Sequence, residues 1–479
     1  MSGQTSPPML RLLLSTTAIV CAVTLSAQTL ISDSLLIAYT PTELAAQGIT
    51  GADYTIEVHW LIYNTVDAFG QATIASGAVV VPVGSTCQHA MATYHHGTIV
   101  NRQDVPSRIS SETIVGYYLA ADDYVAVLPD YLGLGDGPGP HPYIHAQSEA
   151  TASRDMMRAA REFCAQRNVQ LNGQVFLTGY SQGGHACAAT HRLLQEEHAD
   201  EFTVTASAPC SGPYDVSGVQ AQVMVSPDPY PAPYYLPYVI LSYRYVYPWL
   251  FGEVNEIFEE PWATELPPLF QGNNGSGVVD DIMPAAPSEI IIDSVLQAFI
   301  DDPDHPFRQA LRDNDLYDWA PACPTRIIYC EGDNHVFYQN SNVAIAAMQG
   351  NGAPSVSGQS AGAALDHSGC AFPALLNAKM FLDSHRTPCS SIGIAENEGA
   401  KWSIAPNPAW ERVRISRDKP DGVALWRLRA ADGRIIMHGR LAAGASEQWL
   451  DIAGLANGLY AIEVEGERQS AMMRLVVDR

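Results

Sequence analysis

The most informative stretch of this chain reads Gly179-Tyr180-Ser181-Gln182-Gly183-Gly184. It follows a short apolar run, Val175 to Thr178, and precedes a segment with helical character, Gly184 to Gln195. A serine at such a strand-turn-helix junction projects its hydroxyl above the tip of a parallel strand, and small neighbours leave room for the turn. The pattern predicts a nucleophile elbow with Ser181 as the nucleophile. The alternative is a solvated serine in a glycine-rich turn.

A serine nucleophile of this kind needs an acid later in the chain, in a loop just after a strand. The run Thr325 to Cys330 predicts a buried strand, and the short loop after it carries Asp333. We expect Asp333 to be the orienting acid, with Glu331 as its nearest rival. An aspartate that follows a glycine often only bonds its own backbone, which is the structural alternative for Asp333.

The general base should follow the acid in the chain. About a helix and a strand after the expected acid, the segment Leu365 to Cys370 predicts a loop before a helix over Phe372 to Leu382, and this loop carries His367. We expect His367 to take the serine proton. His335 is a weaker candidate because it lies too close in sequence to the acid. His385 falls at the end of the predicted helix, where a histidine more often caps the last carbonyls.

A fourth element must stabilise the charge on the tetrahedral intermediate. The segment Met91 to Thr98 predicts a strand that ends in a His-Gly turn, early in the domain as the second oxyanion donor requires. We expect the N–H of Thr98, with Gly97 as the alternative, to act beside the N–H of Gln182. The two adjacent histidines of this segment point to opposite faces of a strand, which argues against a shared metal ion.

These stretches together resemble the secretory lipase family of α/β-hydrolases, in its lipase-A-like branch. The resemblance extends from about Tyr54 to His385 and implies activity on carboxylic esters, acylglycerols among them, with no cofactor and no metal. It weakens between Val216 and Pro321, so the substrate stays open. Besides the elbow and the Asp333 and His367 loops, the stretches that carry it are Tyr94-His95-His96-Gly97-Thr98, Leu128-Pro129-Asp130-Tyr131-Leu132-Gly133-Leu134-Gly135, His141-Pro142-Tyr143 and Gly212-Pro213-Tyr214-Asp215.

The weakly matching region has a character of its own. It is rich in aromatic residues and proline, as in Tyr230 to Tyr235 and Tyr245 to Phe251. A connection this long must carry structure, so we expect a cap of short helices over about 216–321. Its apolar walls suit an acyl chain, although most of these aromatics form the cap's own core. Proline and charged residues interrupt each apolar run, which argues against a membrane-spanning segment.

The N-terminal segment has the features of an export signal. Arg11 precedes the apolar stretch Leu12 to Leu25, and Ser26-Ala27-Gln28 fits cleavage after Ala27. Export to an oxidising compartment makes disulfides plausible for the eight cysteines after Cys21, although their pairing is open. Some of them, from the set Cys164, Cys187, Cys210 and Cys330, are expected to be small buried apolar residues instead.

The last part of the chain differs in charge and pattern. Residues 401–479 hold 12 basic and 10 acidic residues, whereas residues 28–400 hold 13 and 41, a net charge of −28. Short alternating strands, such as Val423 to Leu428 and Leu459 to Val464, predict a small β-sandwich. The piece resembles the type IX secretion sorting domain through Pro406-Asn407-Pro408, Ala431-Asp432-Gly433-Arg434 and Leu455-Ala456-Asn457-Gly458-Leu459-Tyr460. A carbohydrate-binding or adhesive sandwich is the alternative.

The sequence thus predicts an α/β fold of the α/β-hydrolase type with a largely helical cap insertion, followed by a C-terminal β-sandwich. We expect a signal peptide over 1–27, a catalytic domain over 28–388, a linker over 389–400 and a sorting domain over 401–479. The predicted protein is a serine esterase or lipase, exported through the periplasm and secreted or held at the cell surface.

The expected partners are an ester or lipid substrate and the type IX secretion machinery. The acidic main domain argues against nucleic acid and anionic membranes, and no stable transmembrane anchoring is expected. A peptidase or amidase, an acyltransferase on the same triad, and a non-catalytic surface binding protein are the alternatives.

Overall fold

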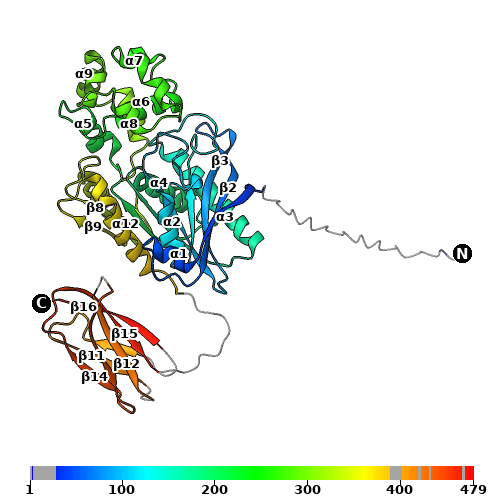
Figure 1. Ribbon diagram of the computed structural model, residues 1–479. Helices are drawn as coiled ribbons and strands as arrows, with labels where there is room; N and C mark the ends of the chain where they lie inside the picture. The colour runs from blue at the N-terminus through cyan, green and yellow to red at the C-terminus, as the bar shows by residue number, and fades with distance from the viewer. Residues whose placement is uncertain are drawn as a thin grey trace. The chain divides into compact units, whose positions relative to one another are not determined.

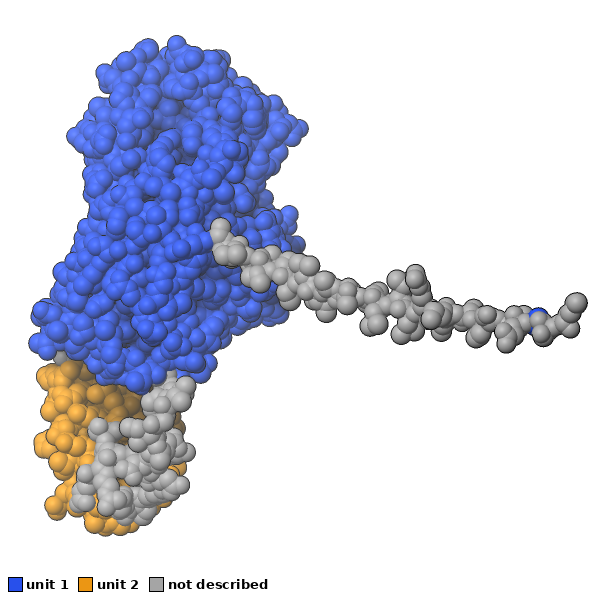
Figure 2. All heavy atoms as spheres, turned by 90° about the vertical axis from the view of Figure 1, so that its right-hand side faces the viewer, with its two compact units in different colours: residues 1–390 blue, residues 391–479 orange. Residues whose placement is uncertain are grey.

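The computed structural model describes residues 3, 28–388, 402–418, 422–430, 433–466 and 470–478. The chain divides into two compact units, unit 1 over residues 1–390 and unit 2 over residues 391–479 (Figure 2). The predicted linker and, except for residue 3, the predicted signal peptide lie outside the described residues.

Unit 1 is built on a sheet of nine strands in the order β1-β2-β3-β5-β4-β6-β7-β8-β9 (Figure 1). Neighbours from β1 to β5 pair antiparallel, and those from β5 to β9 pair parallel. Every residue of β4 and β5 is buried, as expected for central strands that are covered on both faces. The strands are β1 (Leu30–Tyr39), β2 (Thr55–Val66), β3 (Ala72–Val83), β4 (His89–His95), β5 (Tyr124–Pro129), β6 (Leu171–Tyr180), β7 (Val204–Cys210), β8 (Thr325–Cys330) and β9 (Val356–Gly362).

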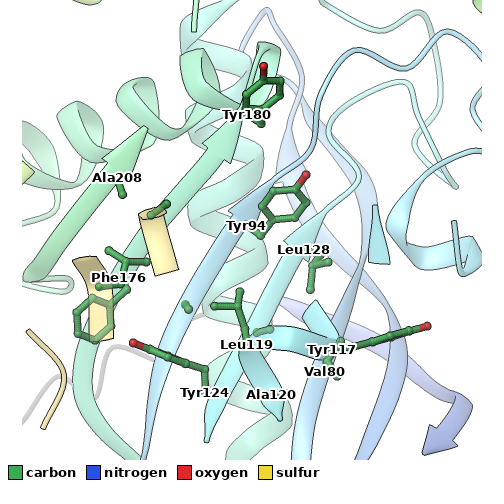
Figure 3. Close-up of a cluster of buried hydrophobic side chains, with 14 of the residues drawn as sticks. Val80, Tyr94, Tyr117, Leu119, Ala120, Tyr124, Leu128, Phe176, Tyr180 and Ala208 are labelled. Carbon is green, nitrogen blue, oxygen red and sulfur yellow. The ribbon is translucent and has the colours of Figure 1, made fainter. Parts of the chain in front are cut away.

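Helices cover both faces of this sheet. Alternate residues of one strand serve the two faces, so Val80 belongs to the buried cluster that includes residues of α2 and α12, while Val79 belongs to the cluster that includes residues of α3 and α4. Figure 3 shows the first of these clusters, in which the rings of Tyr124 and Phe176 meet edge-on at 5.6 Å. The helices are α1 (Pro41–Ala46), α2 (Thr113–Ala120), α3 (Ala146–Arg167), α4 (Gln182–Glu197), α11 (Gln339–Gly350) and α12 (His367–Asp383).

The segment between β7 and β8 forms the predicted cap of short helices, which gather at one end of unit 1 (Figure 1). The cap has its own apolar core, to which Tyr243, Phe258 and Ile290 contribute fully buried side chains. Most of its aromatics are therefore structural, as the sequence indicated. Its helices are α5 (Ala221–Met224), α6 (Tyr235–Val246), α7 (Trp262–Glu265), α8 (Ser276–Asp280), α9 (Asp293–Asp301) and α10 (Pro306–Arg312), with a π-helical turn at Val216–Gln220.

Unit 2 consists of two antiparallel sheets, in the orders β10-β11-β14 and β13-β12-β15-β16. One core lies between them and includes Val413, Trp426 and Ile462. This is the predicted β-sandwich. Its strands are β10 (Trp402–Ala405), β11 (Arg412–Arg417), β12 (Ala424–Ala430), β13 (Ile435–Leu441), β14 (Glu447–Asp451), β15 (Gly458–Glu465) and β16 (Ser470–Val477).

Candidate active site

Ser181 occupies a tight turn between β6 and α4. Its backbone lies at φ 60° and ψ −122°, a conformation that L residues rarely adopt and that recurs at functional sites. Two neighbouring positions have no room for a side chain and therefore require glycine. A Cβ on Gly183 would lie 1.9 Å from the carbonyl oxygen of His95, and one on Gly179 would lie 2.2 Å from that of Gly183. The sequence prediction of an elbow at this position matches this geometry.

The structure brings Ser181, His367 and Asp333 together. His367 Nε2 lies 2.8 Å from Ser181 Oγ, and His367 Nδ1 lies 2.9 and 2.8 Å from the two carboxylate oxygens of Asp333. All three residues are buried, with 5, 6 and 6% of their surfaces exposed in the order Ser181, Asp333 and His367. The three side chains form one continuous hydrogen-bonded chain between segments that are far apart in sequence.

Further hydrogen bonds hold Asp333 and the backbone of His367. Asp333 Oδ1 also accepts hydrogen bonds from the N–H groups of His335 and Val336, at 3.0 and 2.9 Å. The hydroxyl of Tyr180 donates to the carbonyl oxygen of His367 at 2.5 Å. These contacts fix the carboxylate of Asp333 and the backbone that carries the imidazole of His367.

One boundary near the site was predicted incorrectly. We expected His367 in a loop with the helix starting at Phe372, but His367 is the first residue of α12. The side chain of Asp366 caps this helix by accepting a hydrogen bond from the N–H of Gly369 at 2.7 Å. Because an N-cap aspartate satisfies one of the free N–H groups of the first turn, the helix begins five residues earlier.

The rival acid and bases lie elsewhere. Glu331 binds the hydroxyl of Ser360 and is exposed, and His385 packs edge-on against Phe381, at 4.8 Å between ring centroids. His335 stacks on the ring of His367, with centroids 4.7 Å apart and an angle of 22° between the planes. Burial, with a smaller contribution from the charge of His367, lowers the pKa of His335 to about 4, so this ring is neutral at pH 7.

The candidate oxyanion donors lie around Ser181. Gln182 is the first residue of α4, so its N–H is among those that a helix leaves without an intrahelical acceptor. The turn at Gly97 passes beside the nucleophile, since a Cβ on Gly97 would lie 3.9 Å from the Cβ of Ser181. The hydroxyl of the next residue, Thr98, lies 3.0 Å from that of Tyr143.

The two histidines before this turn are bound by protein groups. His95 contacts the carbonyl oxygen of Thr178 and the hydroxyl of Thr190, and His96 contacts the carbonyl oxygens of Gly97 and Asp130. Burial lowers the pKa of His95 to about 4. Across the described residues, no three His, Cys, Asp or Glu side chains come together as a metal site would require.

A cavity of about 380 Å³ opens beside Ser181 and extends under the cap. Its wall is mostly apolar and comes from several cap helices, with Val239, Ile240, Leu250, Phe251, Val295 and Phe299 among the lining residues. Such a cavity suits a hydrocarbon chain whose polar end reaches Ser181.

A polar network behind the nucleophile was not found in the sequence. Glu149, on α3, contacts both Gln182 and His185 of α4, and Gln182 also contacts His141. His141 stood in one of the stretches that carry the family resemblance. Glu149 gave no sequence signal, because a single glutamate in a polar helix looks like a surface residue.

A disulfide joins Cys330 to Cys370, with their Cα atoms 6.0 Å apart. Cys330 is therefore not the free apolar residue that its strand position suggested. Cys87 is disulfide-bonded as well. The thiols of Cys164, Cys187 and Cys210 are free and buried, as expected.

No helix that the structure describes combines the length and the apolar character needed to cross a bilayer.

Two segments match known protein families. Residues 104–224 match the family described as Secretory lipase, and residues 403–478 match the one described as Secretion system C-terminal sorting domain. No curated protein matches the chain.

Several solved structures resemble unit 1. The rice cell wall degrading esterase LipA from Xanthomonas oryzae is 29% identical with a TM-score of 0.69, and its ligand-bound form is 30% identical with a TM-score of 0.68. Both comparisons cover 75% of this chain and 100% of the other. A putative hydrolase from Legionella pneumophila is 29% identical, with a TM-score of 0.68, over 74% of this chain and 98% of that one. Candida antarctica lipase A shares the fold. It is 15% identical, with a TM-score of 0.57, over 77% of this chain and 85% of that one.

The similarity to LipA spans that whole esterase, and the fold and the matched segments agree with it. The chain belongs to the secretory lipase family of α/β-hydrolases and carries a C-terminal secretion-system sorting domain.

Proposed function

We propose that this protein is a secreted serine hydrolase that cleaves carboxylic esters. The observation that carries the proposal is the buried, continuous chain of contacts from Ser181 through His367 to Asp333, which lies at the edge of an apolar cavity. A serine hydroxyl becomes nucleophilic when a neutral imidazole accepts its proton, and a carboxylate on the other ring nitrogen fixes the tautomer that can do so.

In the proposed reaction, Ser181 Oγ attacks the ester carbonyl while His367 Nε2 takes the proton. Asp333 accepts from Nδ1–H and stabilises the imidazolium that forms. The negative oxygen of the tetrahedral intermediate receives hydrogen bonds from the N–H groups of Gln182 and Thr98, with Gly97 as the alternative second donor. His367 then protonates the leaving alcohol, and a water molecule releases the acyl group by the same steps.

The cavity supports an apolar acyl group as the part of the substrate that the cap binds. Its lining side chains carry few charges, whereas a site for a sugar or a phosphate would offer more polar groups. The relative LipA is described as an esterase, which agrees with ester cleavage by this chain.

The C-terminal unit supports export by the secretion machinery that recognises such sorting domains. The signal-like sequence at residues 1–27 would first direct the chain to the periplasm. We therefore propose a secreted or surface-held enzyme. On this proposal, residues 28–388 form the catalytic domain and residues 401–479 the sorting domain.

The test is hydrolysis of p-nitrophenyl esters of graded acyl length by the full chain, with Ser181→Ala as the control. We expect ester hydrolysis that Ser181→Ala abolishes. Matched anilides and added alcohols extend the assay. Faster cleavage of the anilides would replace the proposal with an amidase, and transfer to alcohol in preference to water would replace it with an acyltransferase. No reaction with any of these substrates would favour a binding protein.

A further inference from the structure

The side chain of Gln182 is held by two polar side chains. Its Nε2 lies 2.9 Å from Glu149 Oε1 and 2.8 Å from His141 Nε2. Gln182, Glu149 and His141 are all buried. A buried amide with two fixed acceptors has one orientation, and that orientation also fixes the start of α4, where the backbone N–H of Gln182 lies.

The protonation state of His141 follows from its contacts. His141 Nδ1 lies 2.8 Å from the carbonyl oxygen of Leu132, which can only accept, so the proton is on Nδ1. Nε2 then offers a lone pair to the amide of Gln182. Burial lowers the pKa of His141 to about 4, which keeps the ring in this neutral form at pH 7.

Glu149 accepts a second hydrogen bond from the opposite side. His185 Nδ1 lies 2.7 Å from Glu149 Oε2, and His185 Nε2 lies 2.9 Å from the carbonyl oxygen of Asn314. Burial by itself would raise the pKa of Glu149, but the charge of His185 and the hydrogen bonds from His185 and Gln182 lower it overall. Glu149 is thus a carboxylate, and both ring nitrogens of His185 face acceptors, one of which is Glu149 Oε2.

The contact between Glu149 and His185 matters for catalysis. An unpaired carboxylate next to Gln182 would repel the negative oxygen that forms in the transition state, and burying it alone would be costly. With His185 present, Glu149 can bind the amide of Gln182 strongly without opposing the oxyanion. The amide of Asn314 adds support by accepting from the N–H of Ala146, at the start of the helix that carries Glu149.

We propose that Glu149 is a positioning residue for ester hydrolysis: with His141 it anchors the side chain of Gln182 and so aims the backbone N–H of Gln182 at the developing oxyanion. This proposal rests on the proposed function. It assigns to α3, which carries no member of the triad, a direct influence on the rate of the chemical step.

Two substitutions separate positioning from charge. Glu149→Ala removes the anchor, and we expect kcat to fall about 10- to 100-fold while KM changes by less than about threefold, since a small misplacement of an oxyanion donor acts mainly on the transition state. Glu149→Gln keeps every contact, because its amide oxygen can accept from Gln182 while its amide nitrogen donates to a neutral His185. We expect Glu149→Gln to restore kcat to within about threefold of the wild type.

An aryl boronic acid supplies a second readout. It forms a tetrahedral adduct with Ser181 Oγ and places an oxygen where the oxyanion forms. Its affinity should fall in Glu149→Ala in parallel with kcat, and it should recover in Glu149→Gln.

The proposal is overturned if folded Glu149→Ala keeps its kcat, or if Glu149→Gln is as impaired as Glu149→Ala. If Glu149→Ala does not fold, Gln182→Met takes its place, since it removes both side-chain hydrogen bonds but keeps the backbone N–H. An unchanged kcat in Gln182→Met overturns the proposal, and a lower kcat with an unchanged KM supports it. Failure of the proposed function is recognised separately, because the wild type would then hydrolyse no ester, or Ser181→Ala would be as active as the wild type.

Discussion

The disulfide between Cys330 and Cys370 links the two segments that carry the acid and the base of the candidate triad. Cys330 is the last residue of β8, three residues before Asp333, and Cys370 lies in the first turn of α12, three residues after His367. The bond spans 40 residues in sequence. It therefore restricts how far the ends of β8 and α12 can separate.

Replacement of this disulfide should cost stability more than activity. For a loop of this length, the double variant Cys330→Ala/Cys370→Ala should lose about 3–4 kcal/mol of unfolding free energy. Urea unfolding measures this loss, and Cys323→Ala, which removes a free thiol, is the control. Because the hydrogen bonds of Asp333 and His367 persist, kcat at low temperature should stay near the wild-type value. An equal loss of stability in the control would argue against this account.

The elbow should not tolerate a methyl group at Gly183. A Cβ there would lie 1.9 Å from the carbonyl oxygen of His95. Because this oxygen belongs to the backbone, a small local shift cannot relieve the overlap. We expect Gly183→Ala to be expressed mainly as misfolded protein with no ester hydrolysis. Gly277→Ala in α8 is the matched control, since a Cβ at that position meets nothing within 4 Å. Size-exclusion chromatography and circular dichroism distinguish the two variants, and a folded, active Gly183→Ala would refute the packing argument.

The cavity under the cap should set the preference for acyl length. Val239 of α6 lines it, so Val239→Trp should shorten the space for the chain. We expect kcat/KM to fall about tenfold or more for long acyl esters and to change little for acetate esters. Val278→Trp is the control, because Val278 is an exposed cap residue outside the cavity lining. Equal losses for short and long esters would show that the acyl chain binds elsewhere.

Acid should destabilise unit 1 through its buried histidines. Burial lowers the pKa of His191 to about 3, below the value of about 6.5 expected in the unfolded chain. The unfolded state therefore binds the extra proton, so this stability is complete above about pH 6.5 and is lost as the pH falls toward the folded-state pKa. Between these pKa values the loss approaches about 1.4 kcal/mol per pH unit for one histidine.

The variant His191→Phe isolates this effect. It keeps an aromatic ring against Trp319, whose ring meets that of His191 edge-on at 4.9 Å. The free energy of unfolding, measured by urea titration between pH 7 and 4.5, should fall less steeply with acid in His191→Phe than in the wild type. Equal pH dependences in the two proteins would show that His191 does not contribute to the loss of stability in acid.

The fold and the three candidate catalytic residues could be predicted from the sequence, because spacing and chain order constrain this fold strongly. Ser181, Asp333 and His367 each follow a recognisable strand, and the structure brings the three together. The cap and the C-terminal sandwich were predictable from loop length and alternation.

Other features depend on contacts between distant segments, which a single sequence does not reveal. Glu149 reaches Gln182 and His185 only because α3 packs against α4. The partner of Cys330 could not be chosen among several cysteines for the same reason. The error at the start of α12 is of a different kind, because Asp366 is a good N-cap residue and marks the helix start within the local sequence.

The central claim is that Ser181 is the nucleophile, and labelling with a fluorophosphonate tests it most directly. Intact-protein and peptide mass spectrometry of the full chain should show one adduct, on the peptide that contains Ser181. The adduct should be absent in Ser181→Ala and should form far more slowly in His367→Gln, where the base that accepts the serine proton is missing. Labelling of Ser181 that fails altogether while ester hydrolysis persists, or full hydrolysis by Ser181→Ala, would contradict the account.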